Sequence, residues 1–577
     1  MTIKNREFTG PTMPLSQEID EMKYRQVGES FTDKVLRLAS SMSDNEEHRF
    51  ELENIFGELR FLPAGRVQNA MGSRRITTAY NCFVSGEIKD SMNDIMEMAK
   101  EAAETMRRGG GIGYDFSKIR PRGDVIRSLS SNASGPISFM GIFDAICQTI
   151  ASSGHRRGAQ MGVLRVDHPD IYEFIRAKRN SDKLTGFNIS VGITDKFMEA
   201  VIDNGTFELE FEGKVYDTID ANDLWNEIME STWDWAEPGV LFIDRINEMN
   251  NLYYCETISA TNPCGEQPLP YYGACLLGSF NLAKYVVTGL GSSFDFKQFK
   301  EDIPHVVRAM DNVIDRTIYP LKQQSDEAKN KRRMGLGVTG LANAGELLGL
   351  AYGSKEFFDW AEGIFKILRN GTYAASVELA REKGPFPLFR KDYSKSKFIQ
   401  TLPYKIQKGI RTHGIRNSHL TSIAPTGTIS LVADNVSGGI EPVFSHYYDR
   451  TVNVVDDSGN MVSRVERVKD FAYSLGVKGV TANDITIKEH VDILALASHY
   501  VDSAVSKTCN VGDDITFEEF KNVYIDAYQK GCKGITTFRA TGKRYGILNE
   551  VKEEEADEVE QAEACFIDPQ TGQKECA

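Results

Sequence analysis

The stretch Ala260–Pro270 restricts the local structure of this 577-residue chain more than any other. Its helix-disfavouring residues are Pro263, Gly265, Pro268 and Pro270. Proline lacks a backbone donor and also restricts the residue before it, so these residues discourage a helix and stiffen the segment. We therefore expect a rigid loop here.

Three chemically active side chains lie in this loop: the carboxamide of Asn262, the thiol of Cys264 and the carboxylate of Glu266. Alternate side chains of an extended segment point the same way, so all three are expected to converge on one small molecule. A second thiol, Cys275, follows eleven residues after Cys264, near enough to return to the same pocket. A rigid surface loop with one buried cysteine is the alternative, but acid, thiol and amide together favour an active site.

Composition limits the class of protein. The chain has 67 basic and 82 acidic residues and a net charge of −15, which argues against binding of nucleic acid polymers, because these need a basic face. Single nucleotides stay possible, since backbone amides and a few arginines can hold a phosphate. No apolar run approaches the roughly 18 residues of a membrane span, and Met1–Arg6 lacks the apolar core of a signal peptide, so we expect a cytoplasmic protein. The nine cysteines are then expected to be thiols, redox pairs or ligands rather than a structural disulfide framework.

Helical and strand patterns alternate along the chain. Residues 1–60 are expected to form a helical region, and Phe187–Ile193 alternates like a strand. Further helices are predicted over Ile137–Ile150, Asn222–Trp235, Ile303–Ile318 and Phe357–Lys383. This alternation predicts an α/β fold with a substantial parallel sheet.

A second candidate site lies at Pro425–Thr426–Gly427–Thr428, where a predicted strand ends and Ile429 can begin a helix. Hydroxyls and backbone amides at such a junction can form an anion cradle, with help from the helix dipole. A strand-to-helix turn capped by threonine is the alternative. The loop is not a Walker A motif, because it lacks the G-x-x-x-x-G-K-[ST] pattern.

The central loop resembles a known family. Its sequence is similar to the active-site loop of ribonucleotide reductases, most of all the adenosylcobalamin-dependent class II. The matching residues are Asn262-Pro-Cys264-Gly-Glu266, followed by Gly-Ala-Cys275-Leu-Leu-Gly-Ser-Phe-Asn-Leu282. Motifs in the family's order run from about residue 61 to residue 539. The resemblance implies a ten-stranded α/β barrel over residues 61–548 with the cysteine loop threaded through it. It also implies a flexible redox tail over 549–577. Residues 1–60 are expected to form a helical cap without the ATP-cone that many members carry, because too little chain precedes the catalytic region to hold one.

The resemblance implies reduction of ribonucleotides to 2′-deoxyribonucleotides. A radical derived from adenosylcobalamin would oxidise Cys264 to a thiyl, which abstracts the 3′-hydrogen of the substrate. Glu266 would act as general base on the 3′-hydroxyl, and Asn262 would orient it.

The reducing thiols are also assigned by the resemblance. Cys82 and Cys275 would supply two reducing equivalents and end as a disulfide. The tail cysteines, Cys565 and Cys576, would reduce that disulfide by exchange and then be reset by thioredoxin or a glutaredoxin-like protein.

Substrate and effector residues are implied as well. The substrate would lie against Gly111 and the phosphate loop of Pro425, Thr426, Gly427, Thr428 and Ile429. A dNTP or ATP effector would be bound near residues 85–165 by Asp90, Arg120, Arg127, Arg156 and Arg157. No large insertion separates Asp124 from Ile137, which in this family indicates a homodimer.

Two alternatives stay open. A catalytic subunit fed by a separate metal-radical subunit would carry adjacent tyrosines where this chain has Thr537 and Phe538. A nucleotide-binding homologue without chemistry would not need Asn262, Cys264 and Glu266 together. No histidine pattern predicts a protein-ligated metal, and the sequence leaves diphosphate or triphosphate substrates equally open.

Overall fold

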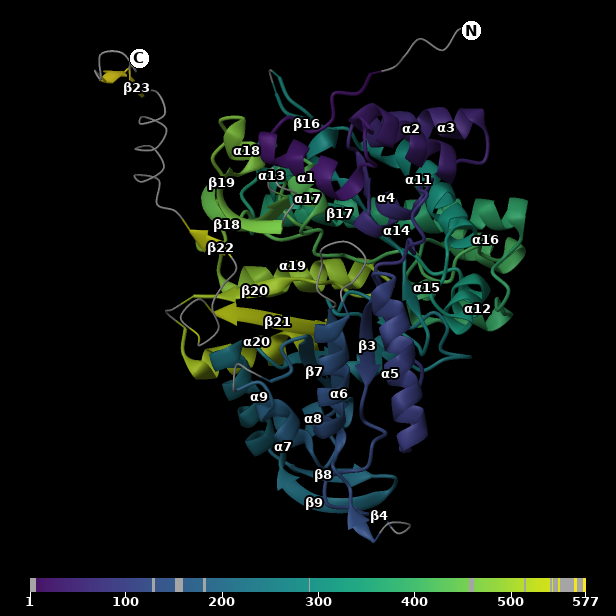
Figure 1. Ribbon diagram of the computed structural model, residues 1–577, viewed down its shortest axis with the longest axis vertical. Coiled ribbons are helices and arrows are strands. Elements are labelled where there is room, and N and C mark those ends of the chain that lie inside the picture. The colour runs from purple at the N-terminus through teal and green to yellow at the C-terminus, as the bar shows by residue number, and fades with distance from the viewer. Residues whose placement is uncertain are drawn as a thin grey trace.

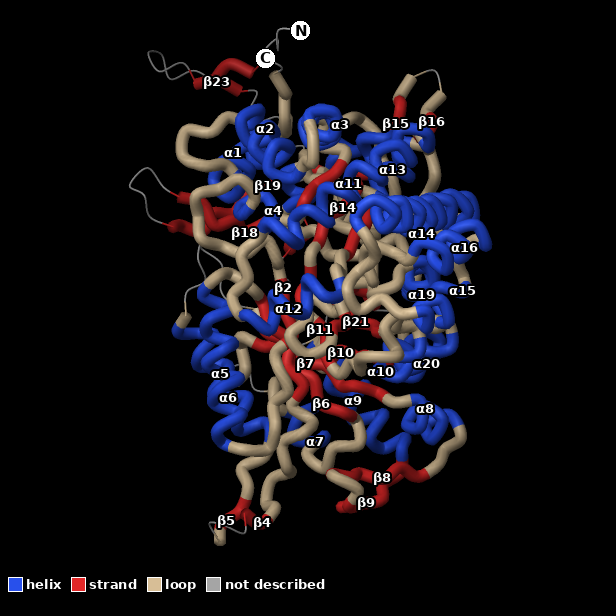
Figure 2. Tube along the Cα trace, turned by 90° about the vertical axis from the view of Figure 1, so that its right-hand side faces the viewer, coloured by secondary structure: helices blue, strands red, loops and turns tan. Residues whose placement is uncertain are grey.

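The computed structural model describes residues 7–126, 130–150, 159–179, 183–289, 291–455, 461–512, 515–539, 542, 548–550, 565–567 and 574–576. Strands occupy the middle of the molecule and helices cover the outside (Figures 1 and 2). The fold is therefore α/β, as the alternating pattern predicts.

Five parallel strands form the first half of the central sheet. In order they are β2 (Cys82–Val84), β3 (Gly111–Asp115), β6 (Gln160–Arg165), β7 (Phe187–Ile193) and β10 (Gly239–Phe242). The helices between them include α5 (Met92–Arg107), α6 (Pro136–Thr149) and α9 (Ala221–Trp235). Helical crossovers are what parallel neighbours require.

The same sheet continues past both ends of this parallel set. Strand β21 (Gly534–Arg539) pairs antiparallel with β10 and parallel with β20 (Thr508–Val511). At the other edge, β13 (Ala274–Cys275) pairs antiparallel with β2. A second sheet has the order β1 (Phe61–Pro63), β14 (Leu277–Asn281) and β17 (Gly335–Thr339).

Two parallel bridges lie between the sheets: Leu336 pairs with Thr421, and Ile423 pairs with Val505. In addition, β13 and β14 are separated only by Leu276. These links run in the order that a closed barrel needs, but the ladders themselves form separate sheets of eight and three strands. The closed ten-stranded barrel stays a prediction.

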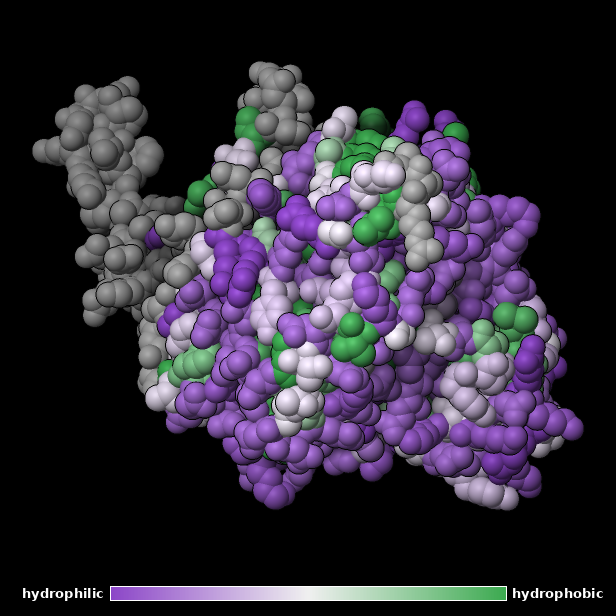
Figure 3. Space-filling view, turned by 90° about the horizontal axis from the view of Figure 1, so that it is seen from below, coloured by the Kyte–Doolittle hydropathy of each residue, from purple (hydrophilic) through white to green (hydrophobic). Residues whose placement is uncertain are grey.

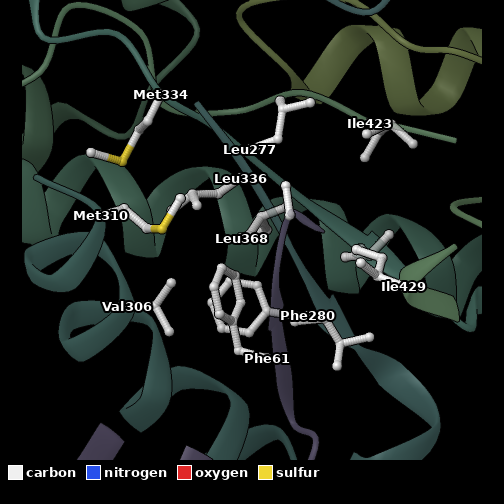
Figure 4. Close-up of a cluster of buried hydrophobic side chains, with 14 of the residues drawn as sticks. Phe61, Leu277, Phe280, Val306, Met310, Met334, Leu336, Leu368, Ile423 and Ile429 are labelled. Carbon is white, nitrogen blue, oxygen red and sulfur yellow. The ribbon is translucent and has the colours of Figure 1, made fainter. Parts of the chain in front are cut away.

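The hydrophobic core forms two large clusters, one on each half of the fold. In the cluster of Figure 4, side chains of β1, β14 and β17 pack against two long helices, α11 (Phe296–Arg316) and α14 (Lys355–Lys383). Phe61 and Phe280 lie edge to face with ring centroids 4.9 Å apart. The outer face of the second sheet is therefore dry.

Helix boundaries match the prediction in part. Helix α14 ends at Lys383, before Gly384 with φ +81°, as predicted. Helix α11 begins seven residues before the predicted start at Ile303, because the Asp295 side chain accepts a hydrogen bond from the Gln298 N–H and caps the helix there. The N-terminal region holds three helices, α1 (Pro14–Tyr24), α2 (Phe31–Met42) and α3 (Glu46–Gly57).

The remaining elements are shorter or lie at the periphery. The helices are α4 (Gly65–Ala70), α7 (Ile171–Arg176), α8 (Asp195–Ile202), α10 (Ile243–Glu248), α12 (Lys322–Lys331), α13 (Leu341–Leu347), α15 (Lys397–Gln400), α16 (Tyr404–His413), α17 (Ile429–Val432), α18 (Phe471–Ser474), α19 (Ile487–Tyr500), α20 (Phe517–Gln529) and the 3-10 helices η1 (Leu282–Tyr285) and η2 (Lys391–Lys395). The strands are β4 (Val125–Ile126), β5 (Ser131–Asn132), β8 (Thr206–Phe211), β9 (Lys214–Asp220), β11 (Ala260–Thr261), β12 (Pro268–Leu269), β15 (Val286–Val287), β16 (Ser293–Phe294), β18 (Tyr447–Val455), β19 (Met461–Lys469), β22 (Leu548–Glu550), β23 (Cys565–Ile567) and β24 (Lys574–Cys576).

The surface of one face is mainly polar. The face seen in Figure 3 is mostly hydrophilic, with a few separate apolar patches. None of the helices in the described ranges is long and apolar enough to cross a membrane.

Candidate active site

The central loop is the tip of a small β-hairpin. Strands β11 and β12 pair antiparallel, with Ala260 opposite Leu269 and Thr261 opposite Pro268. Between them, the Asn262 N–H donates to the Gln267 carbonyl at 3.1 Å. We call residues 260–269 the catalytic hairpin.

The tip of the catalytic hairpin is a tight turn, so the predicted extended geometry is wrong. The Gly265 N–H donates to the Asn262 carbonyl at 3.0 Å, and Gly265 has φ +81°. Proline suits the second position of such a turn, and glycine accepts a left-handed conformation without strain. The turn leaves Cys264 exposed at the tip, while Asn262 and Glu266 are buried beneath it.

Burial changes the acidity of Glu266. Removal from water raises the pKa of its carboxyl to about 7, against the opposing effect of a hydrogen bond that the Asn262 side chain donates. Asn262 Oδ1 accepts from the Gln267 N–H at 2.9 Å, but neither Asn262 Nδ2 nor Glu266 Oε2 has a hydrogen-bond partner of normal geometry within the described residues. These two buried polar groups therefore lie next to each other beneath the turn.

Neighbouring strands hold the catalytic hairpin in place. A Cβ atom at Gly113 of β3 would lie 1.8 Å from the Thr261 carbonyl oxygen, so only glycine fits there. Asn188 of β7 donates from Nδ2 to the Pro263 carbonyl at 3.0 Å.

The other side of the hairpin is fixed through Glu266 itself. Its backbone carbonyl accepts from the Ala504 N–H and from Ser422 Oγ, both at 2.9 Å. Sequence reasoning missed Asn188, Ser422 and Ala504, because each reaches the hairpin only through the fold.

Two cysteines meet beside the hairpin. Cys275 of β13 lies opposite Cys82 of β2 in the strand register. Burial raises the pKa of the Cys275 thiol well above its usual value, a hydrogen bond with Cys82 adds to the rise, and the charges of Glu266 and Cys264 contribute further. The structure therefore brings Cys82, Cys264, Glu266 and Cys275 together.

Gly111 lies at the same place. A Cβ atom on it would be 3.3 Å from Cys82 Sγ and 3.1 Å from Pro263 Cγ. The absence of a side chain keeps the space between the cysteines and the hairpin open.

The loop Pro425–Ile429 has a different geometry from the predicted one. Thr426 is buried, and its hydroxyl lies 2.8 Å from Thr339 Oγ1 and accepts from the Gly439 N–H at 2.7 Å. The helix that follows, α17, has only four residues, because residues 433–435 turn away from helical geometry.

Four consecutive N–H groups of this loop stay available to a ligand. The backbone N–H groups of Thr426, Gly427, Thr428 and Ile429 donate no hydrogen bond within the part of the chain that the structure describes. Gly427 is exposed, and a Cβ atom there would meet nothing within 4 Å. Successive free amides of this kind form a concave anion site.

The predicted effector residues are described only in part. Asp90 and Arg120 form an ion pair with 2.6 Å between Oδ2 and Nε, and the Arg120 N–H also donates to Asp90. Arg127, Arg156 and Arg157 lie outside the described residues.

The tail cysteines occupy two short paired strands. Strand β23 pairs antiparallel with β24, and their register sets Cys565 opposite Cys576. This register sets the backbones of the two cysteines opposite each other, although ten residues separate them in the sequence.

Thr537 and Phe538, where a subunit fed by a metal-radical partner would carry tyrosines, are buried and half-buried, respectively. Thr537 Oγ1 lies 2.8 Å from the Tyr524 hydroxyl, and Phe538 follows it in β21. Neither side chain forms a reversible radical, so these positions offer no relay of adjacent tyrosines.

Comparison with known proteins agrees with this geometry. Residues 80–538 match the family model "Ribonucleotide reductase, barrel domain". The chain is 34% identical to the vitamin B12-dependent ribonucleoside-diphosphate reductase of Thermoplasma acidophilum, over 96% of this chain and 75% of that protein. It is 36% identical to the protein of the same name from Mycobacterium tuberculosis, over 81% of this chain and 68% of that protein. It is 28% identical to the vitamin B12-dependent ribonucleotide reductase of Streptomyces coelicolor, over 91% and 62%.

Proposed function

Because this chain belongs to the ribonucleotide reductases, in their vitamin B12-dependent class, we propose that it converts ribonucleoside diphosphates to 2′-deoxyribonucleoside diphosphates by thiyl-radical chemistry. The observation that carries this proposal is the catalytic hairpin, which presents an exposed Cys264 above a buried Glu266 and beside two further thiols. A catalytic subunit fed by a metal-radical subunit is not favoured by these relatives.

The residues present fit the implied cofactor. When bound, adenosylcobalamin supplies an organic radical that can oxidise a thiol. Cys264 suits that role because its thiol is exposed at the hairpin tip, whereas the other groups of the site are buried or half-buried.

The remaining steps use groups of this chain. The Cys264 sulfur radical takes the 3′-hydrogen of the substrate and later returns it. Glu266 accepts the proton of the 3′-hydroxyl, and its raised pKa of about 7 suits proton transfer near neutral pH. Asn262, whose side chain is buried beside Glu266, donates from Nδ2 to the oxygen of that hydroxyl.

Cys82 and Cys275 supply the reduction. The high pKa of Cys275 keeps it a thiol, so it can protonate the leaving 2′-hydroxyl as water. The two thiols lose two hydrogens in all and form one disulfide, while C2′ of the sugar exchanges its hydroxyl for hydrogen.

The substrate phosphates are assigned to the four N–H groups of Thr426–Ile429, and Gly111 lies against the sugar. The exposed Gly427 and the open space above it support this assignment. Because the Thr426 hydroxyl is engaged inside the fold, its backbone rather than its side chain would bind the phosphate.

A homodimer with a nucleotide effector is the proposed assembly. Helices α5 and α6 pack on each other. On α5, Met92 and Met96 are exposed at 60% and 46%, and on α6 Gly141 and Ala145 are exposed. Such a face suits a second copy of the chain. Asp90 lies two residues before the start of α5, so an effector dNTP or ATP bound by Asp90 and Arg120 would lie near that end of the helix.

The tail pair Cys565 and Cys576 is proposed to reduce the Cys82–Cys275 disulfide, with a thioredoxin-like protein as the final donor. The strand register supports this, because it sets the backbones of the two residues opposite each other.

Anaerobic turnover of CDP and CTP tests the function. The purified chain is assayed with dithiothreitol, with and without adenosylcobalamin, and with no second protein. We expect deoxynucleotide only with the cofactor, and mainly from CDP. Product that requires a metal-loaded partner subunit instead would contradict the proposal.

A further inference from the structure

Asn281, the last residue of β14, is a buried amide without hydrogen bonds. It has no exposed surface, yet neither Nδ2 nor Oδ1 has a hydrogen-bond partner among the residues that the structure describes. Among the described residues, no other buried side chain leaves two polar atoms unpartnered. A buried amide without partners disfavours folding, so its presence calls for a compensating role such as contact with a bound molecule.

The side chain faces the interior, on the side of the catalytic hairpin. A Cβ atom on Gly335 of β17 would lie 2.3 Å from Gln267 Nε2, so that face of β17 looks toward the hairpin. Alternate residues of a strand share a face, which places Thr339 on it too. Asn281 is the parallel register partner of Thr339 and shares its face.

The neighbouring residues confirm this orientation. Gly278, on the opposite face of β14, would place a Cβ atom 2.2 Å from Phe61 in the dry core of Figure 4. A Cβ atom on Gly340 would lie 3.0 Å from Asn281 Oδ1, so glycine there leaves the amide room.

Asn281 also lies next to the loop assigned to the substrate phosphates. Thr339 links the two, because its hydroxyl is 2.8 Å from that of Thr426. Adjacent strands are about 4.8 Å apart, so the backbone of Asn281 lies one strand spacing from that of Thr339.

We propose that Asn281 is a substrate-binding residue whose Nδ2 donates to a phosphate oxygen of the bound nucleotide. The proposal deepens the proposed function and rests on it, since the phosphate loop defines the ligand. The amide is neutral, so it orients the phosphate without adding charge, and Oδ1 can accept from a ligand hydroxyl or a water that enters with it.

Calorimetric binding of CDP, without the cofactor, tests the proposal. The variants are Asn281→Ala, which removes the donor, and Asn281→Asp, which keeps the shape but can place a negative charge beside the phosphate. Asn417→Ala is the matched control, because Asn417 is equally buried but its Nδ2 donates to Asp311 and to the Arg332 carbonyl.

We expect Asn281→Ala to weaken CDP binding about 10- to 100-fold, as for loss of one hydrogen bond to a charged group. Asn281→Asp should weaken it further. The melting temperature of unliganded Asn281→Ala should fall less than that of Asn417→Ala, because no hydrogen bond is lost.

Three outcomes would overturn the inference. CDP binding by Asn281→Ala as tight as that of the wild type would exclude a contact, and Asn281→Asp binding as well as Asn281→Ala would exclude a phosphate beside the amide. A melting temperature as low as that of Asn417→Ala would assign Asn281 a structural role. Failure of the wild type itself to bind CDP would instead contradict the proposed function.

Discussion

Cys275 lies directly opposite Cys82 in the antiparallel pair of β13 and β2. Side chains at opposed positions are near neighbours, so these thiols can join without moving either strand. Turnover of CDP without added reductant is therefore expected to leave a Cys82–Cys275 disulfide. Peptide mapping by mass spectrometry after alkylation measures it.

The buried thiols Cys147 and Cys509 are the controls for that experiment, because burial raises the pKa of both. They should remain reduced. Alkylation of Cys82 to the same extent before and after turnover would contradict its role.

The proposed role of the tail cysteines predicts that their loss affects turnover differently with two reductants. Serine variants of Cys565 and Cys576 should lose turnover supported by thioredoxin but keep turnover supported by dithiothreitol, which is small enough to reach the active-site disulfide directly. Steady-state rates with each reductant measure this, with the exposed Cys255→Ser as control. Equal loss with both reductants would place the tail cysteines elsewhere in the reaction.

The raised pKa of Glu266 predicts a pH dependence. The carboxylate must be ionised to act as a base, so kcat/KM should fall about tenfold for each pH unit below about 7 and level off above it. Glu266→Gln should lose most activity and this dependence together. A wild-type profile that is flat from pH 5.5 to 8 would contradict the assignment.

Stability reports the same titration independently. The pKa of the Glu266 carboxyl is higher in the folded protein than in the unfolded chain. The protonated carboxyl therefore adds to the free energy of unfolding below the unfolded pKa, and this contribution is lost as the pH rises through about 7. The free energy of unfolding of Glu266→Gln, relative to that of the wild type, should thus be about 3 kcal/mol higher at pH 8 than at pH 4. Urea unfolding at both pH values measures it.

The contact of Gly113 with the hairpin predicts a backbone effect. Gly113→Ala would force its Cβ atom against the Thr261 carbonyl and shift the catalytic hairpin, so turnover should be lost. Gly363→Ala, in α14 with nothing within 4 Å, is the matched control and should raise stability by about 0.5–1 kcal/mol with activity kept. Full activity of Gly113→Ala would show that the hairpin position is not critical.

Local patterns predicted much of the fold. The alternation of Phe187–Ile193 gave a strand with the observed bounds, and Gly384 marked the end of α14, because both depend on nearby residues. The early start of α11 depends on one cap, Asp295, outside the apolar pattern.

The site was predictable in its residues but not in its geometry. The Asn262, Cys264 and Glu266 triplet identified the loop, yet its turn depends on a backbone hydrogen bond that sequence spacing does not reveal. Asn281 carries no local signal at all. Its proposed role follows from the lack of hydrogen-bond partners among the described residues around its buried amide, which the sequence alone does not reveal.

The most direct test of the account is dCDP formation by Cys264→Ser, measured anaerobically with adenosylcobalamin beside calorimetric binding of CDP. The account predicts no detectable dCDP while CDP binds as tightly as to the wild type, because serine cannot form the sulfur radical but leaves the hairpin intact. Formation of dCDP by Cys264→Ser at a rate near that of the wild type would contradict it.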